Sequence, residues 1–115
     1  MALPMSPADF KGLWLQALRS RGYRQGRGYL MERDSRGPRY CCLGVGVRVL
    51  GLLDMETGGC VYDEDAEPEY GQFSPGLQRA LGMDETLMQR LINMNDGDRA
   101  TFAQIADVID EEYNP

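Results

Sequence analysis

Arginines interleaved with tyrosines make up the stretch of this sequence that is best equipped for binding chemistry. The candidate ligand-binding residues are Arg21, Tyr23, Arg24, Gln25, Arg27 and Tyr29, with Arg39 and Tyr40 on a segment expected to return beside them. A guanidinium can hold a phosphate through two parallel hydrogen bonds, and a tyrosine ring offers a stacking surface for a base. The pattern therefore predicts a site for a phosphorylated small molecule or nucleotide. The competing interpretation is a solvated basic loop that balances an acidic half of the chain.

The adjacent cysteines Cys41 and Cys42 are the second place where side chains could do chemistry. A thiol beside Arg39 at the start of a helix would have a lowered pKa and could act as a nucleophile. Free cysteines are more often small, buried apolar residues, and that interpretation is favoured here. The sequence contains no histidine, which excludes Cys–His and Ser–His pairs within it. We therefore expect no catalytic residues, no cofactor and no enzymatic activity.

A metal site is not expected either. The three cysteines lack the C-x-x-C spacing of structural zinc sites. The acidic stretch 93–98 fails as a calcium loop: with Gly97 at the sixth position, the loop would end on Ala103, where a glutamate belongs. We interpret this stretch as a turn.

Charge is divided unevenly along the chain. Residues 1–51 hold nine basic and three acidic residues, giving +6, whereas residues 52–115 hold three basic and fifteen acidic residues, giving −12, for a net charge of −6. The candidate partner-binding residues are acidic: Asp63, Glu64, Asp65, Glu67, Glu69, Glu111 and Glu112. Such a surface opposes direct DNA binding and suits a partner protein with a basic surface.

The first helix is predicted by its cap and its apolar spacing. Ser6 suits the N-cap, Pro7 suits the first helical position, and apolar residues recur from Phe10 to Leu18 at helical spacing. A hairpin is expected next, with one strand over 29–33, a turn over 34–37 and a return strand from Pro38 to Tyr40.

Residues 42–50 form an apolar segment that suits either a helix or a buried strand, and the helix is favoured. Gly44 and Gly46 lower helix propensity, but another backbone packed closely there would explain them. A second small hairpin is expected around Gly58 and Gly59.

Three more helices are predicted: one opening at Ser74, one capped by Asp84, and one starting with a capping box of Thr101 and Gln104. The expected fold is α+β, with about four helices packed around one or two short antiparallel hairpins in a single domain over residues 1–115. No apolar run approaches the ~20 residues that span a bilayer, and the first residues do not resemble a signal peptide. We therefore expect no membrane association and a cytosolic location.

The string Tyr40-Cys41-Cys42-Leu43-Gly44-Val45 resembles a motif of small phage and prophage proteins of uncharacterised activity. The resemblance continues in the segments 14–26 and 91–96 and in residues 101–109. Members typically read Gly-Val-Leu-Cys after the cysteine pair, whereas this chain has Gly46 and Val47 at the last two of those positions. The resemblance implies a mobile-element protein acting in the cytosol of a bacterial host.

Two functional hypotheses follow from this context. The first is a non-enzymatic counter-defence protein that binds and occludes an effector of a bacterial immune system, such as CRISPR–Cas. The alternative is a protein that sequesters a phosphorylated small molecule or nucleotide immune signal through the Arg/Tyr segment. A cysteine-dependent enzyme is a third, less favoured class. The sequence does not decide the oligomeric state, and a homo-oligomer is possible.

Overall fold

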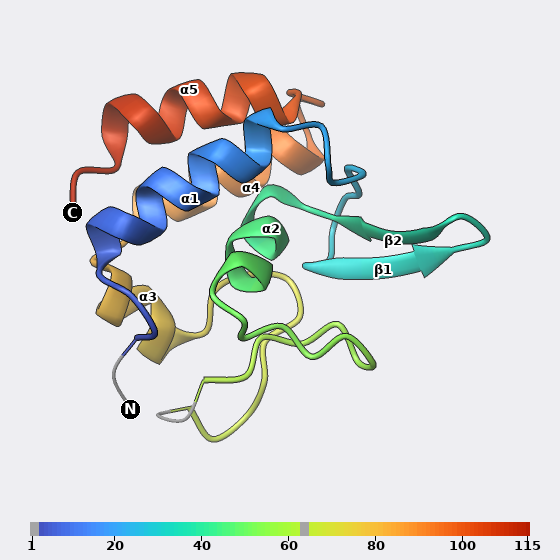
Figure 1. Cartoon of the computed structure of the whole chain (residues 1–115), viewed down its shortest axis with the longest axis horizontal. Helices are drawn as coiled ribbons and strands as arrows, with labels where there is room; N and C mark the ends of the chain where they lie inside the picture. Colours follow the sequence, from blue (N-terminus) through green and yellow to red (C-terminus); the bar gives the residue numbers. More distant parts are fainter. Residues whose placement is uncertain (1–2, 63–64) are drawn as a thin grey trace.

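The computed structural model describes residues 3–62 and 65–115, and its elements alternate between helix and hairpin in the first half of the chain. The elements are α1 (Pro7–Arg19), β1 (Met31–Asp34), β2 (Gly37–Tyr40), α2 (Cys42–Val49), α3 (Pro75–Leu81), α4 (Glu85–Asp96) and α5 (Phe102–Glu112). The predicted α+β class is confirmed, with five helices and one two-stranded antiparallel sheet in the described residues. Figure 1 shows α1 lying between α5 and α2, and the hairpin projecting from the helical body.

The core is organised around α1. This helix begins as the sequence predicts, because the Ser6 hydroxyl accepts the Asp9 N–H at 3.1 Å. Phe10 and Trp14 are fully buried and stack with ring centroids 5.0 Å apart. The indole N–H of Trp14 donates to the carbonyl of Cys42 at 2.9 Å, which ties α1 to the first turn of α2.

Residues 42–49 are a helix, as favoured, and the two glycines have separate packing reasons. A Cβ on Gly44 would lie 1.8 Å from the carbonyl oxygen of Leu30, so only glycine fits there. Gly46 lies under the rings of Phe10 and Trp14, both 3.1 Å from where its Cβ would be. The close backbone approach expected from the sequence therefore occurs at Gly44, while Gly46 accommodates aromatic side chains.

The predicted hairpin is present, with Met31 opposite Tyr40 and Asp34 opposite Gly37. In the segment before it, Gln25 forms a single parallel bridge with Tyr40, the last residue of β2. The Tyr40 N–H donates to the Arg24 carbonyl at 2.8 Å, and the Gly26 N–H donates to the Tyr40 carbonyl at 2.7 Å. A hairpin alone is marginally stable in water, and this bridge ties the end of β2 to the preceding segment.

The second hairpin expected around Gly58 and Gly59 forms no regular strands in the described residues. Only single bridges occur, between Leu53 and Cys60 and between Cys60 and Glu69. The Gly58 N–H donates to the Asp54 carbonyl at 2.7 Å and closes a tight loop. Outside this loop the Asp54 N–H donates to the Gly59 carbonyl and the Val61 N–H donates to the Leu52 carbonyl, each at 2.9 Å, so the chain does turn back on itself there.

The last helices start at the caps that the sequence predicts. The Asp84 carboxylate accepts the Thr86 N–H at 2.7 Å, and Thr101 and Gln104 form the reciprocal capping box of α5. None of the helices in the described part of the chain has the length and apolar character needed to cross a membrane.

Candidate functional site

Arg24, one of the predicted ligand residues, holds the hairpin together. Its guanidinium makes two hydrogen bonds with the Asp34 carboxylate, at 2.9 Å and 2.6 Å, and a third with the Gly37 carbonyl at 3.2 Å. This guanidinium and the N–H of Arg36 hold the pKa of the Asp34 carboxyl well below its usual range. The bidentate geometry that suits a phosphate is therefore occupied by a carboxylate of the same chain.

Arg39 and Tyr40 are also engaged within the fold. Arg39 pairs with Glu32 at 2.8 Å and lies 3.5 Å from Asp34. The Tyr40 side chain is buried, and its ring meets the ring of Tyr23 edge-on with centroids 5.3 Å apart. The Arg39 guanidinium is thus already paired with carboxylates of the same chain, although 37% of its side chain is exposed, and the Tyr40 ring is enclosed.

The amide of Gln25 points into the protein. Its Nε2 donates to Asn95 Oδ1 at 2.9 Å and to the Ala100 carbonyl at 2.8 Å. Arg27 and Tyr29 lie further along the same segment and are exposed, with 57% of Tyr29 accessible to solvent. The eight predicted residues therefore do not converge on one site.

Asn95 is a structural centre that sequence reasoning missed, since the stretch 93–98 was interpreted as a turn. It is fully buried in the last turns of α4. Its Oδ1 accepts the Cys42 N–H at 3.2 Å as well as Gln25, and its Nδ2 donates to the Gly26 carbonyl at 2.9 Å and to Asp96 at 2.8 Å. One side chain thus joins α4, the start of α2 and the Arg/Tyr segment.

A pocket does form beside part of the predicted set. We call it the Arg21 pocket; it has a volume of about 440 Å³ and is lined by Leu18, Arg19, Arg21, Tyr23, Gln25, Thr101, Phe102 and Ala103. It lies between the end of α1, the segment that follows and the start of α5. Three of the eight predicted ligand residues, Arg21, Tyr23 and Gln25, therefore share one cavity.

The cysteine pair is enclosed by the core. Cys41 and Cys42 are buried and not in a disulfide. Burial raises the pKa of the Cys41 thiol to about 12 and raises that of Cys42 well above its ordinary value. The Cys41 sulfur accepts the Gly44 N–H at 3.4 Å, so it caps α2. These environments match the buried apolar role favoured from the sequence.

The predicted acidic residues lie in different settings. Asp63 and Glu64 fall outside the described residues. Asp65 faces inward, where its Oδ1 accepts the Gly76 N–H at 2.9 Å in the first turn of α3. Burial alone would raise the pKa of this carboxyl, but hydrogen bonds from Ser74 and from the Gly76 N–H bring it below its ordinary value. Asp65 therefore caps a helix.

The remaining predicted acidic residues form two separate surfaces. Glu67 is exposed and Glu69 is half-buried in the irregular segment before α3, whereas Glu111 and Glu112 are exposed at the end of α5. Figure 1 shows α5 along one side of the molecule and the irregular segment on the opposite side. One flat partner surface would therefore meet only one of these groups.

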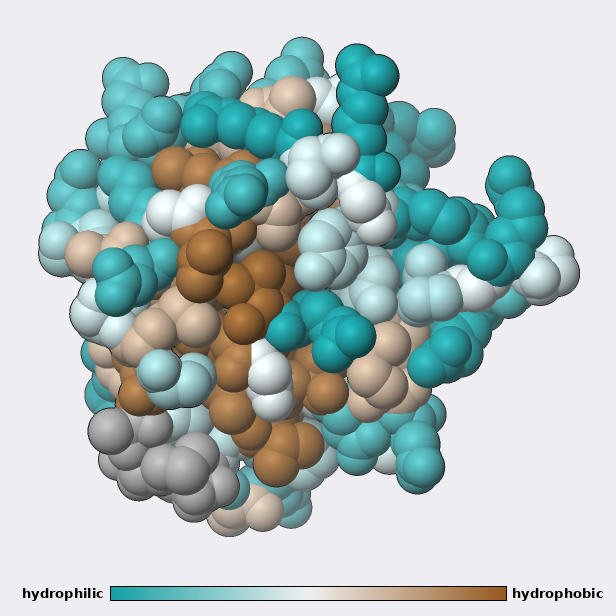
Figure 2. Space-filling model, viewed as in Figure 1, coloured by the Kyte–Doolittle hydropathy of each residue, from teal (hydrophilic) through white to brown (hydrophobic). Residues whose placement is uncertain are grey.

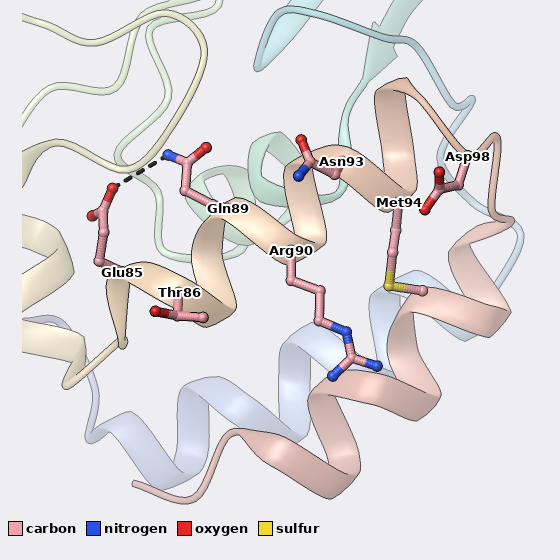
Figure 3. Close-up of a pocket in the computed structure, with 7 residues that line it drawn as sticks. All are labelled: Glu85, Thr86, Gln89, Arg90, Asn93, Met94 and Asp98. Atoms are coloured by element: carbon pink, nitrogen blue, oxygen red, sulfur yellow. Dashed lines mark hydrogen bonds between the residues drawn. The ribbon is translucent and has the colours of Figure 1, made fainter.

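The outer side of α4 carries a groove of about 740 Å³, shown in Figure 3. Its lining residues are Glu85, Thr86, Gln89, Arg90, Asn93, Met94 and Asp98. Figure 3 shows Arg90 extending toward α5, where it pairs with Glu112. The groove is therefore joined to the end of α5 through the Arg90–Glu112 pair.

Comparison with protein-family models, with curated proteins and with solved structures finds no match for this chain. Within the described ranges, no group of three or more histidine, cysteine, aspartate or glutamate side chains is placed to hold a metal ion.

Apolar side chains also reach the surface. Figure 2 shows them gathered over α1, α2 and the segment that follows α2. Leu13 and Val61 are 44% and 50% exposed, and Val49 and Leu52 are partly exposed. These four residues line neither the Arg21 pocket nor the groove on α4.

Proposed function

We propose that this chain is a non-enzymatic, phage-encoded counter-defence protein that binds and occludes an effector of a bacterial immune system in the host cytoplasm. The observation that carries the proposal is the row of exposed carboxylates on α5. Asp107, Asp110 and Glu111 stand at positions i, i+3 and i+4, which places them on neighbouring parts of one helix face. An effector of the CRISPR–Cas type is a suitable target because it binds nucleic acid through basic surfaces.

The negative charges of the α5 row suit binding to a basic, nucleic-acid-binding surface. Proteins that bind nucleic acid place lysine and arginine against phosphates, and this electrostatic term supplies much of their affinity. The Asp107 and Asp110 side chains are 75% and 56% exposed, although both also contact Arg19. The Glu111 side chain has no ion pair with a described residue, so its charge is available to a partner.

The irregular segment provides a matched control for this surface. Glu67 is an exposed glutamate like Glu111, but it belongs to the irregular segment before α3, which Figure 1 shows on the side of the molecule opposite α5. A Glu111→Arg variant reverses charge on the proposed surface, and Glu67→Arg makes the same change away from it. Both positions are exposed, so neither change is expected to shift stability by more than ~0.5 kcal/mol.

Affinity capture from the host at low and at high salt tests the proposal. We expect the wild-type chain and Glu67→Arg to retain a stoichiometric effector that salt releases, and Glu111→Arg to lose it. If Glu67→Arg and Glu111→Arg retained the effector equally, the α5 row would not be the binding surface. Absence of any stoichiometric partner at low salt would contradict occlusion itself.

A further inference from the structure

We propose that the Arg21 pocket binds a small molecule that carries one phosphate and a ring with an amino group, of the nucleoside monophosphate class. The pocket adjoins the acidic row on α5, because Arg19 lines the pocket and pairs with Asp107 and Asp110. Ligand binding there goes beyond occlusion of an effector. Four features of the pocket support it: a free cation, a free hydrogen-bond acceptor, an apolar floor and a small net local charge.

Arg21 provides the cation. The neighbouring arginines are neutralised within the fold, Arg19 by Asp107 and Asp110 and Arg24 by Asp34. The Arg21 guanidinium has no ion pair with any described residue, although it lines the cavity. A guanidinium in this state can accept a phosphate in the bidentate geometry without breaking an internal pair.

Gln25 provides the acceptor. Its Nε2 donates to Asn95 and to the Ala100 carbonyl, which fixes the orientation of the amide. Its carbonyl oxygen makes no hydrogen bond within the described residues. An oriented, unused acceptor selects a ligand group that donates, such as the amino group of a nucleobase.

The floor and the size of the pocket suit the ring of such a ligand. Leu18 and Phe102 are buried side chains that line the cavity, and the half-buried Tyr23 forms part of its wall. The pocket volume of about 440 Å³ lies in the lower part of the range typical of small-ligand pockets, roughly 300–1,000 Å³. These dimensions favour a mononucleotide over a longer nucleic acid.

The local charge favours a single phosphate. Arg19 and Arg21 line the pocket, while Asp107 and Asp110 contact Arg19 and offset its charge. A triphosphate would place several negative charges near these carboxylates, and like charges at close range repel. We therefore expect adenosine monophosphate to bind more tightly than adenosine triphosphate.

The backbone of Arg21 makes a clean variant available. Its φ is +62°, a left-handed conformation that glycine adopts readily. Arg99 has a φ of +58° and does not line the pocket, so it is a matched control. Arg21→Gly removes the guanidinium while keeping the backbone, and Arg99→Gly makes the same change elsewhere. Ala103→Leu, on the exposed rim at the start of α5, fills the cavity without removing a polar group.

Isothermal titration of the whole chain with adenosine monophosphate, adenosine, inorganic phosphate and adenosine triphosphate tests the site. We expect the monophosphate to bind at least tenfold more tightly than the other three. Arg21→Gly and Ala103→Leu should each weaken that binding at least tenfold, and Arg99→Gly should leave it unchanged. The proposal is overturned if the monophosphate binds no better than phosphate or adenosine, or if all three variants behave alike. Effector capture by Arg21→Gly is expected to be normal, because Arg21 lies outside α5 and makes no ion pair with the acidic row, so failure here is distinct from failure of occlusion.

Discussion

The side chains of Gln25 and Asn95, 70 residues apart in the chain, are joined by a hydrogen bond of 2.9 Å from Gln25 Nε2 to Asn95 Oδ1. The same oxygen accepts the Cys42 N–H, and Asn95 Nδ2 donates to the Gly26 carbonyl. A buried amide with its donors and acceptor occupied fixes how three segments meet. The position of Gln25 at the Arg21 pocket therefore depends on Asn95.

Replacing Asn95 should destabilise the whole fold. Asn95→Ala would leave the Cys42 N–H and the Gly26 carbonyl without their partner, and the cost is expected to be about 2–4 kcal/mol. Asn93→Ala, an exposed asparagine on the same helix, should change stability by less than ~0.5 kcal/mol. Urea denaturation of both variants measures the difference. Equal stabilities would show that Asn95 does not connect these segments.

Gly44 and Gly12 are both helical glycines, yet alanine should have opposite effects at the two positions. At Gly44 the added methyl would meet the Leu30 carbonyl at 1.8 Å, so Gly44→Ala should cost several kcal/mol, at least ~3, or prevent folding. Gly12 has no neighbour within 4 Å of its Cβ position, so Gly12→Ala should stabilise the chain by up to ~1 kcal/mol. Thermal melts of the two variants provide the comparison. A tolerated alanine at Gly44 would contradict the packing of α2 against Leu30.

The Arg24–Asp34 pair predicts a dependence of stability on acid. Asp34 has a depressed pKa in the folded protein, chiefly because it accepts hydrogen bonds from Arg24. The contribution of the Asp34 carboxylate to folding stability is therefore present above its pKa in the unfolded chain, about 3.9, and is lost as the pH falls toward its pKa in the folded protein. The Asp34→Asn variant should lose less stability than the wild type between pH 5 and pH 2. The control is Asp98→Asn, because Asp98 is exposed and has no ion pair with a described residue. This variant should keep the pH dependence of the wild type. Parallel pH curves for wild type and Asp34→Asn would contradict this assignment.

The buried thiols should resist modification in the folded protein. Burial raises the pKa of Cys41 to about 12, so its reactive thiolate is scarce at neutral pH. Ellman's reagent at pH 8 should label Cys41 and Cys42 slowly in buffer and rapidly in denaturant. Fast labelling of either residue in buffer would reopen the thiol chemistry that their burial disfavours.

The elements that the sequence predicted well depend on local signals. The Ser6 cap, the apolar spacing of α1 and the capping box at Thr101 involve residues a few positions apart, and each is present in the fold. The hairpin was also visible in the turn residues, although β1 begins at Met31 instead of residue 29.

The composition of the site was less predictable because it depends on long-range contacts. The sequence shows that Arg24 is near Asp34 in the chain, but only the folded hairpin reveals that the two form a bidentate pair. Asp65 carries the charge of a partner-facing residue, yet it caps α3. The bond from Gln25 to Asn95 spans 70 residues and has no local signature.

Displacement of nucleic acid from a captured effector tests occlusion by the acidic row on α5 most directly. A labelled nucleic acid is bound to the purified effector at low salt, and the chain is titrated in while fluorescence anisotropy reports release. We predict that the wild type and Glu67→Arg release the nucleic acid at a stoichiometric ratio, and that Glu111→Arg requires at least tenfold more protein. Nucleic acid that stays bound while the wild-type chain saturates the effector would contradict occlusion.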